Sequence, residues 1–202
     1  MLVVSRQSAL KHCCKAKFTF ANALTQTGLR MKDWGSAIIV ALLSVWPASA
    51  KVEKSDAAGF VLVYEDDVAV PPDVAFARFL EIGKWWSSDH SYSGDASNMK
   101  ISSGPGGCWC ETVPGGGHVQ HMQVVNVQPG SLLVLSGGLG PLQFLGVSGS
   151  MTISFAPKEA GTHVSLRYVV GGYDPDKFAK WPAAVDLVLG AGFESYLAFA
   201  AK

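Results

Sequence analysis

The chain has 202 residues, enough for one domain or for one domain preceded by a targeting segment. Hydrophobic residues make up 49% and charged residues only 16%, against about 25% charged in ordinary soluble domains, which indicates a large buried apolar area. The sequence contains no block of like charge, internal repeat or low-complexity tract, so we expect no nucleic-acid partner.

The two ends of the chain differ in charge, although the net charge is zero. Residues 1–30 contain five Lys or Arg and no acidic residue, whereas residues 51–202 contain ten Lys or Arg and fifteen Asp or Glu. A basic leader before an acidic body is typical of targeting rather than of folded structure. Residues 1–30 are therefore either a basic leader or the product of a start codon assigned too early, with Met31 as the true start.

Residues 31–50 have the pattern of a signal peptide. Lys32 supplies a short charged region, residues 35–46 are apolar, and Ala48 and Ala50 match the A-x-A cleavage pattern. The apolar run is too short for a span of about 20 residues, so we expect cleavage near Ala50 and no stable membrane span afterwards. The sequence thus predicts an exported protein, periplasmic or secreted, that begins with a flexible polar tail over residues 51–57.

The mature body begins with a strand and a short helix. Residues 60–70 are rich in Val and aromatic side chains, which favour a strand, and two prolines end it. The prolines, an early Asp and an apolar stripe predict a helix over residues 72–82. Six further strands, separated by turns, are expected over residues 98–103, 108–113, 118–127, 131–136, 147–156 and 162–170.

The segment from Asp176 to Lys202 has the longest helical period. Its apolar face consists of Phe178, Trp181, Val185, Val188, Gly192, Tyr196 and Phe199, spaced mostly by three or four residues. A helix starting at Asp176 conflicts with Pro182, whose ring clashes with the preceding turn. The main helix therefore either begins near Trp181 or is kinked at Pro182, and Asp174 or Asp176 is a candidate cap.

The order of elements predicts an α+β fold. Tight turns between successive strands imply an antiparallel sheet, here of about seven strands with short helices after the first. The long C-terminal helix must bury its apolar face against one side of that sheet. A curved sheet wrapped on a long helix leaves room for an apolar cavity between the two.

Potentially reactive side chains concentrate in the predicted hairpin of residues 104–122. Two Cys, a Glu and two His lie within fourteen residues there. His118 and His121 are three apart on one strand, so they face opposite sides of the sheet and at most one can join a shared site. Whether Glu111 meets His121 depends on the register of the hairpin, because a slip of one residue reverses the face.

The hairpin could hold a metal site, a structural polar cluster or an acid–base site. The spacing of its His and Glu residues, taken with His90, matches no known metal signature, and we expect neither a metal nor a cofactor. A polar cluster in which His and Glu satisfy each other beside a cavity mouth is the simplest alternative. A Glu beside a buried His could also transfer a proton, which makes His90, Glu111 and His121 the candidate catalytic residues.

Cys108 and Cys110 are two residues apart on a strand and therefore face the same way. An exported protein with paired cysteines suggests a disulfide. Residues two apart on an extended strand are, however, about 6.6 Å or more from each other, near the upper limit for a bridge. We therefore expect two buried thiols, with Trp109 on the opposite face.

Aromatic residues are the candidate walls of a ligand pocket. A small-molecule site needs an apolar lining with a few polar groups. The candidate ligand-binding residues are Trp85, Trp86, Tyr92, Trp109, Phe144, Tyr173 and Trp181. Asp186 would add an acid to the cavity if it faced inward. The Gly-rich loop of residues 138–146 is either a mobile lid or a loop that simply packs down.

Six segments resemble the SRPBCC superfamily of START-like, birch-pollen-allergen-like domains, which includes polyketide cyclase/dehydrase-like proteins. They are V-P-P-D-V-A-F at 70–76, W-W-S-S-D-H-S-Y-S-G at 85–94, G-G-C-W-C-E-T-V-P-G-G-G at 106–117, H-M-Q-V-V at 121–125, G-P-L-Q at 140–143 and V-D-L-V-L at 185–189. The resemblance covers residues 58–202 and implies a helix-grip fold with a deep apolar pocket under the last helix.

The resemblance leaves several functions open, because fold does not determine function. The favoured interpretation is an exported binding protein for a hydrophobic small molecule or lipid. The first alternative is a cyclase, dehydratase or isomerase that uses Glu111 and a His as acid and base. The second is a protein-interaction module, which a cavity closed by bulky side chains would favour.

Overall fold

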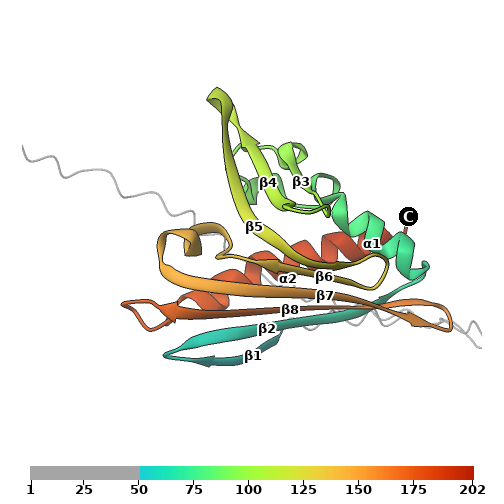
Figure 1. The fold of residues 1–202 in the computed structure, drawn as a ribbon. Helices are drawn as coiled ribbons and strands as arrows, with labels where there is room; N and C mark the ends of the chain where they lie inside the picture. Colours follow the sequence, from blue (N-terminus) through green and yellow to red (C-terminus); the bar gives the residue numbers. More distant parts are fainter. Residues whose placement is uncertain (1–50) are drawn as a thin grey trace, which may run out of the picture. The chain divides into compact units, whose positions relative to one another are not determined.

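The computed structural model describes residues 51–202, so the expected leader and signal peptide lie outside the described residues. This part of the chain forms an α+β helix-grip fold, which confirms the prediction from the sequence (Figure 1). Eight antiparallel strands make one sheet in the order β1-β2-β8-β7-β6-β5-β4-β3, and the long helix α2 lies across one face of it.

The strands are β1 (Lys51–Asp56), β2 (Gly59–Val68), β3 (Met99–Ile101), β4 (Cys108–Val113), β5 (Gly117–Gln128), β6 (Leu132–Ser136), β7 (Gly146–Lys158) and β8 (Gly161–Tyr173). The α-helices are α1 (Pro72–Leu80) and α2 (Trp181–Ala200). Short 3-10 turns are η1 (Ile82–Lys84), η2 (Ser88–His90), η3 (Ala96–Asn98), η4 (Pro114–Gly116) and η5 (Gly140–Phe144).

The seven predicted strands and both helices are present, and β1 is an eighth strand that the sequence did not indicate. Residues 51–57 were expected to form a loose tail, which is wrong. Residues 51–56 pair with β2 at the edge of the sheet, and the Asp56 carboxylate closes the turn by accepting the N–H of Ala58 at 2.8 Å. Main-chain pairing holds this polar, exposed strand, so it lacks the apolar pattern that marks the others.

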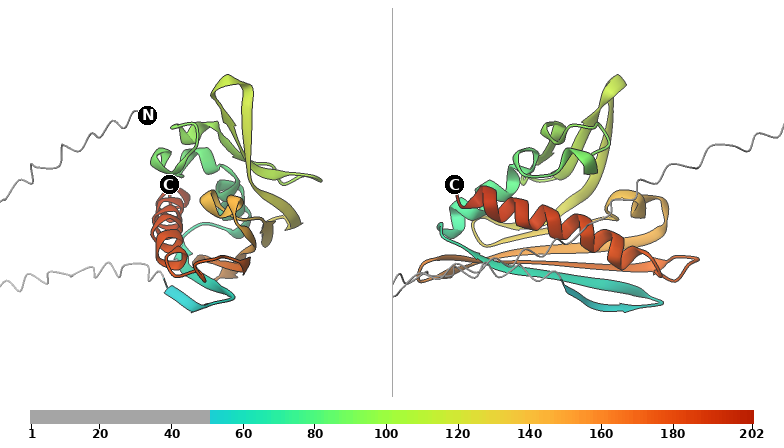
Figure 2. Two further views of the ribbon diagram at one scale, coloured as in Figure 1. Left: turned by 90° about the vertical axis from the view of Figure 1, so that its left-hand side faces the viewer. Right: turned by 180° about the vertical axis from the view of Figure 1, so that it is seen from behind.

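Two register shifts bend strand β5. One lies between Val124 and Asn126 where β5 pairs with β6, and the other lies opposite Trp109 and Cys110 of β4. An extra residue in one strand of an antiparallel pair makes that strand bend and twist more strongly. The hairpin of β4 and β5 accordingly turns out of the plane of β6–β8, and Figure 2 shows end-on how the sheet curves around α2.

Helix α2 begins at Trp181, with Pro182 in its first turn, where a missing N–H breaks no helical hydrogen bond. Pro182 therefore does not need to kink the helix. Asp174 does not cap α2. Its buried carboxylate instead accepts the N–H groups of Asp176 at 3.2 Å and Phe178 at 2.7 Å, and so shapes the segment that connects β8 to α2.

Hydrogen bonds from α1 and β2 fix the position of α2. The Tyr196 hydroxyl donates to the carbonyl of Ala75 at 3.0 Å, and the Arg78 guanidinium donates to the carbonyl of Ala200. Farther along the helix, the Tyr64 hydroxyl donates to the Asp186 carboxylate at 2.8 Å. Burial, reinforced by this bond to Asp186, raises the pKa of Tyr64, so the phenol stays protonated. Asp186 thus ties the helix to the sheet.

Helix α2 approaches Trp86 closely at Gly192. A methyl group built on Gly192 would come within 2.7 Å of the indole ring of Trp86, which is nearly buried. The Trp86 ring also packs edge-on against Trp85 and Trp109, so it has little room to retreat. The absence of a side chain at position 192 therefore lets Trp86 lie against the helix.

We predict that Gly192→Ala lowers the stability of the protein by about 1–3 kcal/mol through overpacking. Helix propensity alone would act in the opposite direction, stabilising the protein by about 1 kcal/mol. Urea unfolding measures the difference in the free energy of unfolding between Gly192→Ala and the wild type. The exposed neighbour provides the control, because Ala191→Gly should cost only the propensity term. A Gly192→Ala protein more stable than the wild type would show that Trp86 does not press against α2.

Candidate functional site

A pocket of about 360 Å³ opens between α2, the η5 segment and the loop after η1. Its walls are predominantly apolar. The lining residues are Trp86, His90, Ser91, Tyr92, His121, Leu139, Gly140, Pro141, Leu142, Trp181, Ala184, Val185 and Val188. Three segments far apart in the sequence therefore meet at one cavity, to which β5 contributes a single side chain, His121.

The η5 segment is tied to the sheet at both ends. At its start, the Tyr168 hydroxyl donates to the carbonyl of Gly137 at 3.1 Å and accepts the N–H of Leu139 at 3.0 Å. Burial raises the pKa of Tyr168 to about 12, so the phenol remains a donor. Near its end, the Gln143 side-chain amide donates to the carbonyl of Gln120 on β5 at 2.8 Å. Hydrogen bonds hold the segment at these two points, and between them it covers one side of the pocket.

The β4–β5 bulge turns His121 toward the pocket. Trp109 pairs with Met122 and Cys110 pairs with Gln120, so His121 is the extra residue on β5. A regular strand would alternate faces, but His121 and Met122 are consecutive and both buried. The expected separation of the two histidines still holds, because His118 is exposed and His121 is 4% exposed.

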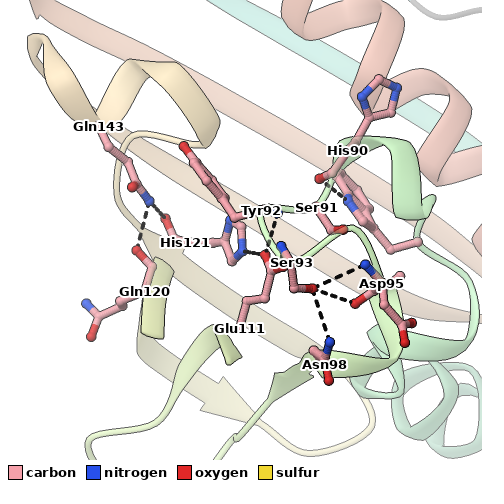
Figure 3. A network of polar contacts seen from close by, with 12 residues as sticks. His90, Ser91, Tyr92, Ser93, Asp95, Asn98, Glu111, Gln120, His121 and Gln143 are labelled. Atoms are coloured by element: carbon pink, nitrogen blue, oxygen red, sulfur yellow. Dashed lines mark hydrogen bonds and ion pairs between the residues drawn. The ribbon is translucent and has the colours of Figure 1, made fainter. Parts of the chain in front are cut away.

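Glu111 and His121 form a buried hydrogen-bonded pair. The Nε2 of His121 lies 2.9 Å from Oε2 of Glu111, and the side chains are nearly inaccessible to solvent. The two residues are diagonal neighbours across the strands, since Glu111 pairs directly with Val119. The Glu111 carboxylate also accepts the backbone N–H groups of Tyr92 and Ser93, as Figure 3 shows. One carboxylate therefore orients both the histidine and the loop beside it.

The environment sets the protonation of this pair. Burial raises the pKa of Glu111, but hydrogen bonds from Ser93, Tyr92 and His121 outweigh it, so the pKa lies below its ordinary value and the group is ionised. Burial lowers the pKa of His121 more than the neighbouring Glu111 raises it. A neutral His121 that donates from Nε2 to the carboxylate keeps an unprotonated Nδ1. Among the hydrogen bonds of residues 51–202, the imidazole of His121 takes part only through Nε2.

Of the three candidate catalytic residues, the structure brings Glu111 and His121 together but leaves His90 apart from them. His90 lines the pocket, and its carbonyl accepts the indole N–H of Trp86 at 3.0 Å. Figure 3 shows its imidazole directed away from the Glu111–His121 pair. His90 can therefore contact a pocket ligand but does not share the buried network.

The seven candidate ligand-binding aromatics fall into three groups. Trp86, Tyr92 and Trp181 line the pocket. Trp85 and Trp109 do not; they are buried in the core, Trp85 against Phe79 and Tyr196, and Trp109 between Trp86 and His121. Phe144 and Tyr173 are largely exposed and lie outside the pocket lining. Composition identified aromatic walls, but it could not assign each ring to a wall, the core or the surface.

Several lining residues were not among the candidates. Leu139 and Leu142 belong to the loop that the sequence predicts as either a lid or a packed loop, and Val185 and Val188 belong to the predicted apolar face of the helix.

Within residues 51–202, no group of three or more His, Cys, Asp or Glu is arranged to hold a metal ion. Helix α2 is long and apolar enough, by length and composition alone, to cross a membrane.

Cys108 and Cys110 form a disulfide, so the expected pair of thiols is wrong. Their Cα atoms are 5.4 Å apart, well inside the range for a bridge. A regular extended strand would separate them by about 6.6 Å. The strand is shorter than regular at the point where the register with β5 shifts. Both cysteines are half-buried, on the face of β4 opposite to Trp109 and Glu111.

Comparison with solved structures finds several proteins that are similar to this chain. An uncharacterized protein from Rhizobium leguminosarum is 18% identical with a TM-score of 0.53, covering 75% of this chain and 96% of that chain. A protein from Mesorhizobium loti is 16% identical with a TM-score of 0.50, covering 69% and 95%. The di-domain ARO/CYC StfQ from the steffimycin biosynthetic pathway is 17% identical with a TM-score of 0.48, covering 72% and 50%.

These similarities concern the fold. No protein-family model matches the chain, and no curated protein matches it. The first two structures have the architecture of residues 51–202 at low identity. Because one fold hosts many unrelated functions, the function of this chain has to be argued from its own pocket.

We predict that the protein loses stability as the pH falls from 7 toward 5. The folded-state pKa of His121 lies below its ordinary value of 6.5, so the unfolded chain binds the proton first. The free energy of unfolding is therefore highest above about 6.5 and declines below it. Glu111, whose pKa is also lowered, adds to the loss only at lower pH, near and below its ordinary 4.5.

Urea unfolding at a series of pH values tests this dependence. His121→Gln should flatten the curve between pH 7 and 5. His118→Gln, three residues earlier on the same strand and exposed, should leave the curve as in the wild type. An unchanged slope in His121→Gln would show that His121 is not the group responsible.

Proposed function

We propose that the protein binds a hydrophobic small molecule in the pocket between α2, η5 and the loop of residues 86–92. The observation that carries the proposal is the pocket itself, whose predominantly apolar walls include one buried, oriented histidine. Apolar walls with a few placed polar groups are the usual form of a small-molecule site. The open cavity also argues against the protein-interaction alternative, which a closed interior would favour.

The pocket favours a compact, amphipathic ligand over a long-chain lipid. Its volume of about 360 Å³ is near the lower end of the range of about 300–1,000 Å³ for ligand pockets. Trp86, Tyr92 and Trp181 offer flat aromatic surfaces for a ring system. The unpartnered Nδ1 of His121 would accept a hydrogen bond from a ligand hydroxyl or amine. We therefore infer a cyclic compound that carries at least one hydrogen-bond donor.

Export is part of the proposal and rests on the sequence alone. The pattern of residues 31–50 predicts cleavage near Ala50, after which the described domain would act in the periplasm or outside the cell. A disulfide between Cys108 and Cys110 is compatible with an oxidising compartment.

A second candidate function, acid–base catalysis on the bound ligand, is favoured by the Glu111–His121 pair. A carboxylate that holds Nε2–H of a histidine fixes the tautomer and leaves Nδ1 free to take a proton from a substrate. The lowered pKa of His121 keeps this base neutral at physiological pH. The arrangement suits proton abstraction, as in cyclisation, dehydration or isomerisation, within an apolar cavity.

We predict that filling the pocket weakens ligand binding without unfolding the protein. Native mass spectrometry of the protein purified from its own host should reveal a co-purifying small molecule. Ala184→Trp places a large ring in the pocket lining and should weaken binding of that molecule, or of 1-anilinonaphthalene-8-sulfonate, at least tenfold. The matched control is Ala191→Trp, exposed on the same helix but outside the pocket. Equal affinities in the two variants would contradict binding at this site.

We predict that His121→Gln lowers any turnover of the bound ligand by at least about 100-fold, the usual contribution of general acid–base catalysis. Glu111→Gln should lower turnover less and alter its pH profile, because it removes the charge that opposes the fall in the His121 pKa. Mass spectrometry of the ligand after incubation measures conversion, and His118→Gln is the control. Binding with no conversion in the wild type would exclude catalysis and leave the binding function intact.

A further inference from the structure

We propose that Cys108–Cys110 is a thiol–disulfide exchange site whose redox state sets the position of Trp109 and so the shape of the neighbouring pocket. The proposal deepens the proposed function, on which its effect on ligand binding rests. The exchange itself and its effect on Trp109 do not depend on ligand binding.

The disulfide does not act as a structural staple. It joins residues two apart on one strand, so it links no separate elements and closes only a very short loop. A bond of this kind removes less chain entropy from the unfolded state than one that closes a long loop. Strand β4 pairs with β3 on one side and with β5 on the other, and these main-chain pairings already hold this part of the sheet. The disulfide therefore has to have a role other than cross-linking.

The disulfide is placed for exchange with a small thiol. Both cysteines are half-buried on the outer face of the sheet, away from the core. Lys100, on the short edge strand β3, pairs directly with Cys110 and is exposed. Directly paired residues project from the same face of the sheet, with Cβ atoms about 4.5–5.5 Å apart. A nearby ammonium group favours the thiolate form of a cysteine, both as a leaving group and as a nucleophile.

The reaction balances with two equivalents of a low-molecular-weight thiol. The first thiolate attacks one sulfur, the Cys108–Cys110 bond breaks, and the other cysteine leaves as a thiolate that takes up a proton. A second thiol then attacks the mixed disulfide. It releases the second cysteine, which is also protonated, and the oxidised disulfide of the small thiol. Two electrons thus pass from the two small thiols to the protein, and oxidation reverses the sequence.

Trp109 lies between the two cysteines, so opening the disulfide alters the backbone that carries its side chain. Its side chain enters the core, where it packs edge-on against Trp86 at a ring separation of 4.9 Å and lies tilted against the His121 ring at 5.5 Å. Both of these neighbours line the pocket. No hydrogen bond holds the indole N–H of Trp109 within residues 51–202. The ring position therefore depends on packing and on the backbone that carries it.

Reduction releases a geometric restraint on that backbone. The bonded Cα atoms are 5.4 Å apart, whereas residues two apart on an extended strand are about 6.6 Å apart. The restrained stretch also lies opposite the bulge that places His121. When the sulfurs separate, β4 can lengthen at Trp109, which shifts its ring against Trp86 and His121 together. Oxidised and reduced protein therefore have different pockets.

The test uses the full chain with Cys13→Ser and Cys14→Ser, so that Cys108 and Cys110 are the only cysteines. The protein is equilibrated with reduced and oxidised glutathione at several ratios, without denaturant, and alkylated with N-ethylmaleimide. Intact-mass spectrometry should show two thiols appearing together in the folded protein. Alkylation that requires prior unfolding would overturn the exchange site.

Indole N–H resonances of ¹⁵N-labelled protein report the coupling directly. The Trp109 resonance, assigned with Trp109→Phe, should move on reduction. The Trp85 resonance should stay in place, because that indole is held in the core by a hydrogen bond to the Phe79 carbonyl at 3.2 Å. A Trp109 resonance that is identical in both redox states would overturn the coupling, whatever the thiol count shows.

The affinity for 1-anilinonaphthalene-8-sulfonate should differ at least threefold between the oxidised and reduced forms. The Cys108→Ser, Cys110→Ser variant should keep the reduced-form affinity in both buffers. Equal affinities in the two redox states would overturn the effect on the pocket. If neither form binds the dye or the co-purified ligand, the proposed function fails, while the thiol count and the Trp109 resonance still decide the redox proposal.

Discussion

The candidate site is organised around a buried carboxylate, that of Glu111. A charge removed from water is tolerated only when hydrogen bonds replace its hydration, and Glu111 has three donors for this purpose. The donors come from a loop about twenty residues earlier and from the paired strand about ten residues later. Satisfying one carboxylate therefore fixes the loop that carries Tyr92, the ring of His121 and the position of both relative to the sheet.

The curvature of the sheet makes room for the pocket that His121, the partner of this carboxylate, lines. Regular pairing between β4 and β5 would have sent His121 and Met122 to opposite faces, but the extra residue in β5 turns both inward. The same irregularity lies opposite the disulfide. On the other side of the pocket, α2 is held by α1 and β2, and Gly192 lets Trp86 come close enough to form part of the wall.

The elements of the fold could be predicted because each leaves a local pattern. The period of three to four residues marked α2, and of the two alternatives that Pro182 left open, a start near Trp181 or a kink, the structure has the first. Strand β1 was missed because it is a polar edge strand held by main-chain pairing. In the site, the concentration of Glu and His in one hairpin drew attention to Glu111 and His121. Trp85 and Trp109 were placed in the pocket wall because composition alone does not distinguish a wall from the core behind it.

The sequence by itself determined the order of the elements, the antiparallel sheet and the apolar character of the interior, because periodicity, turn residues and composition act over short stretches of chain. Only the tertiary structure decided that His121 faces the pocket, that Glu111 reaches it diagonally and that Cys108 and Cys110 are bonded. These outcomes depend on a single extra residue in the register between two strands. Strand register is set by packing against segments distant in the chain, here the loop that Glu111 holds.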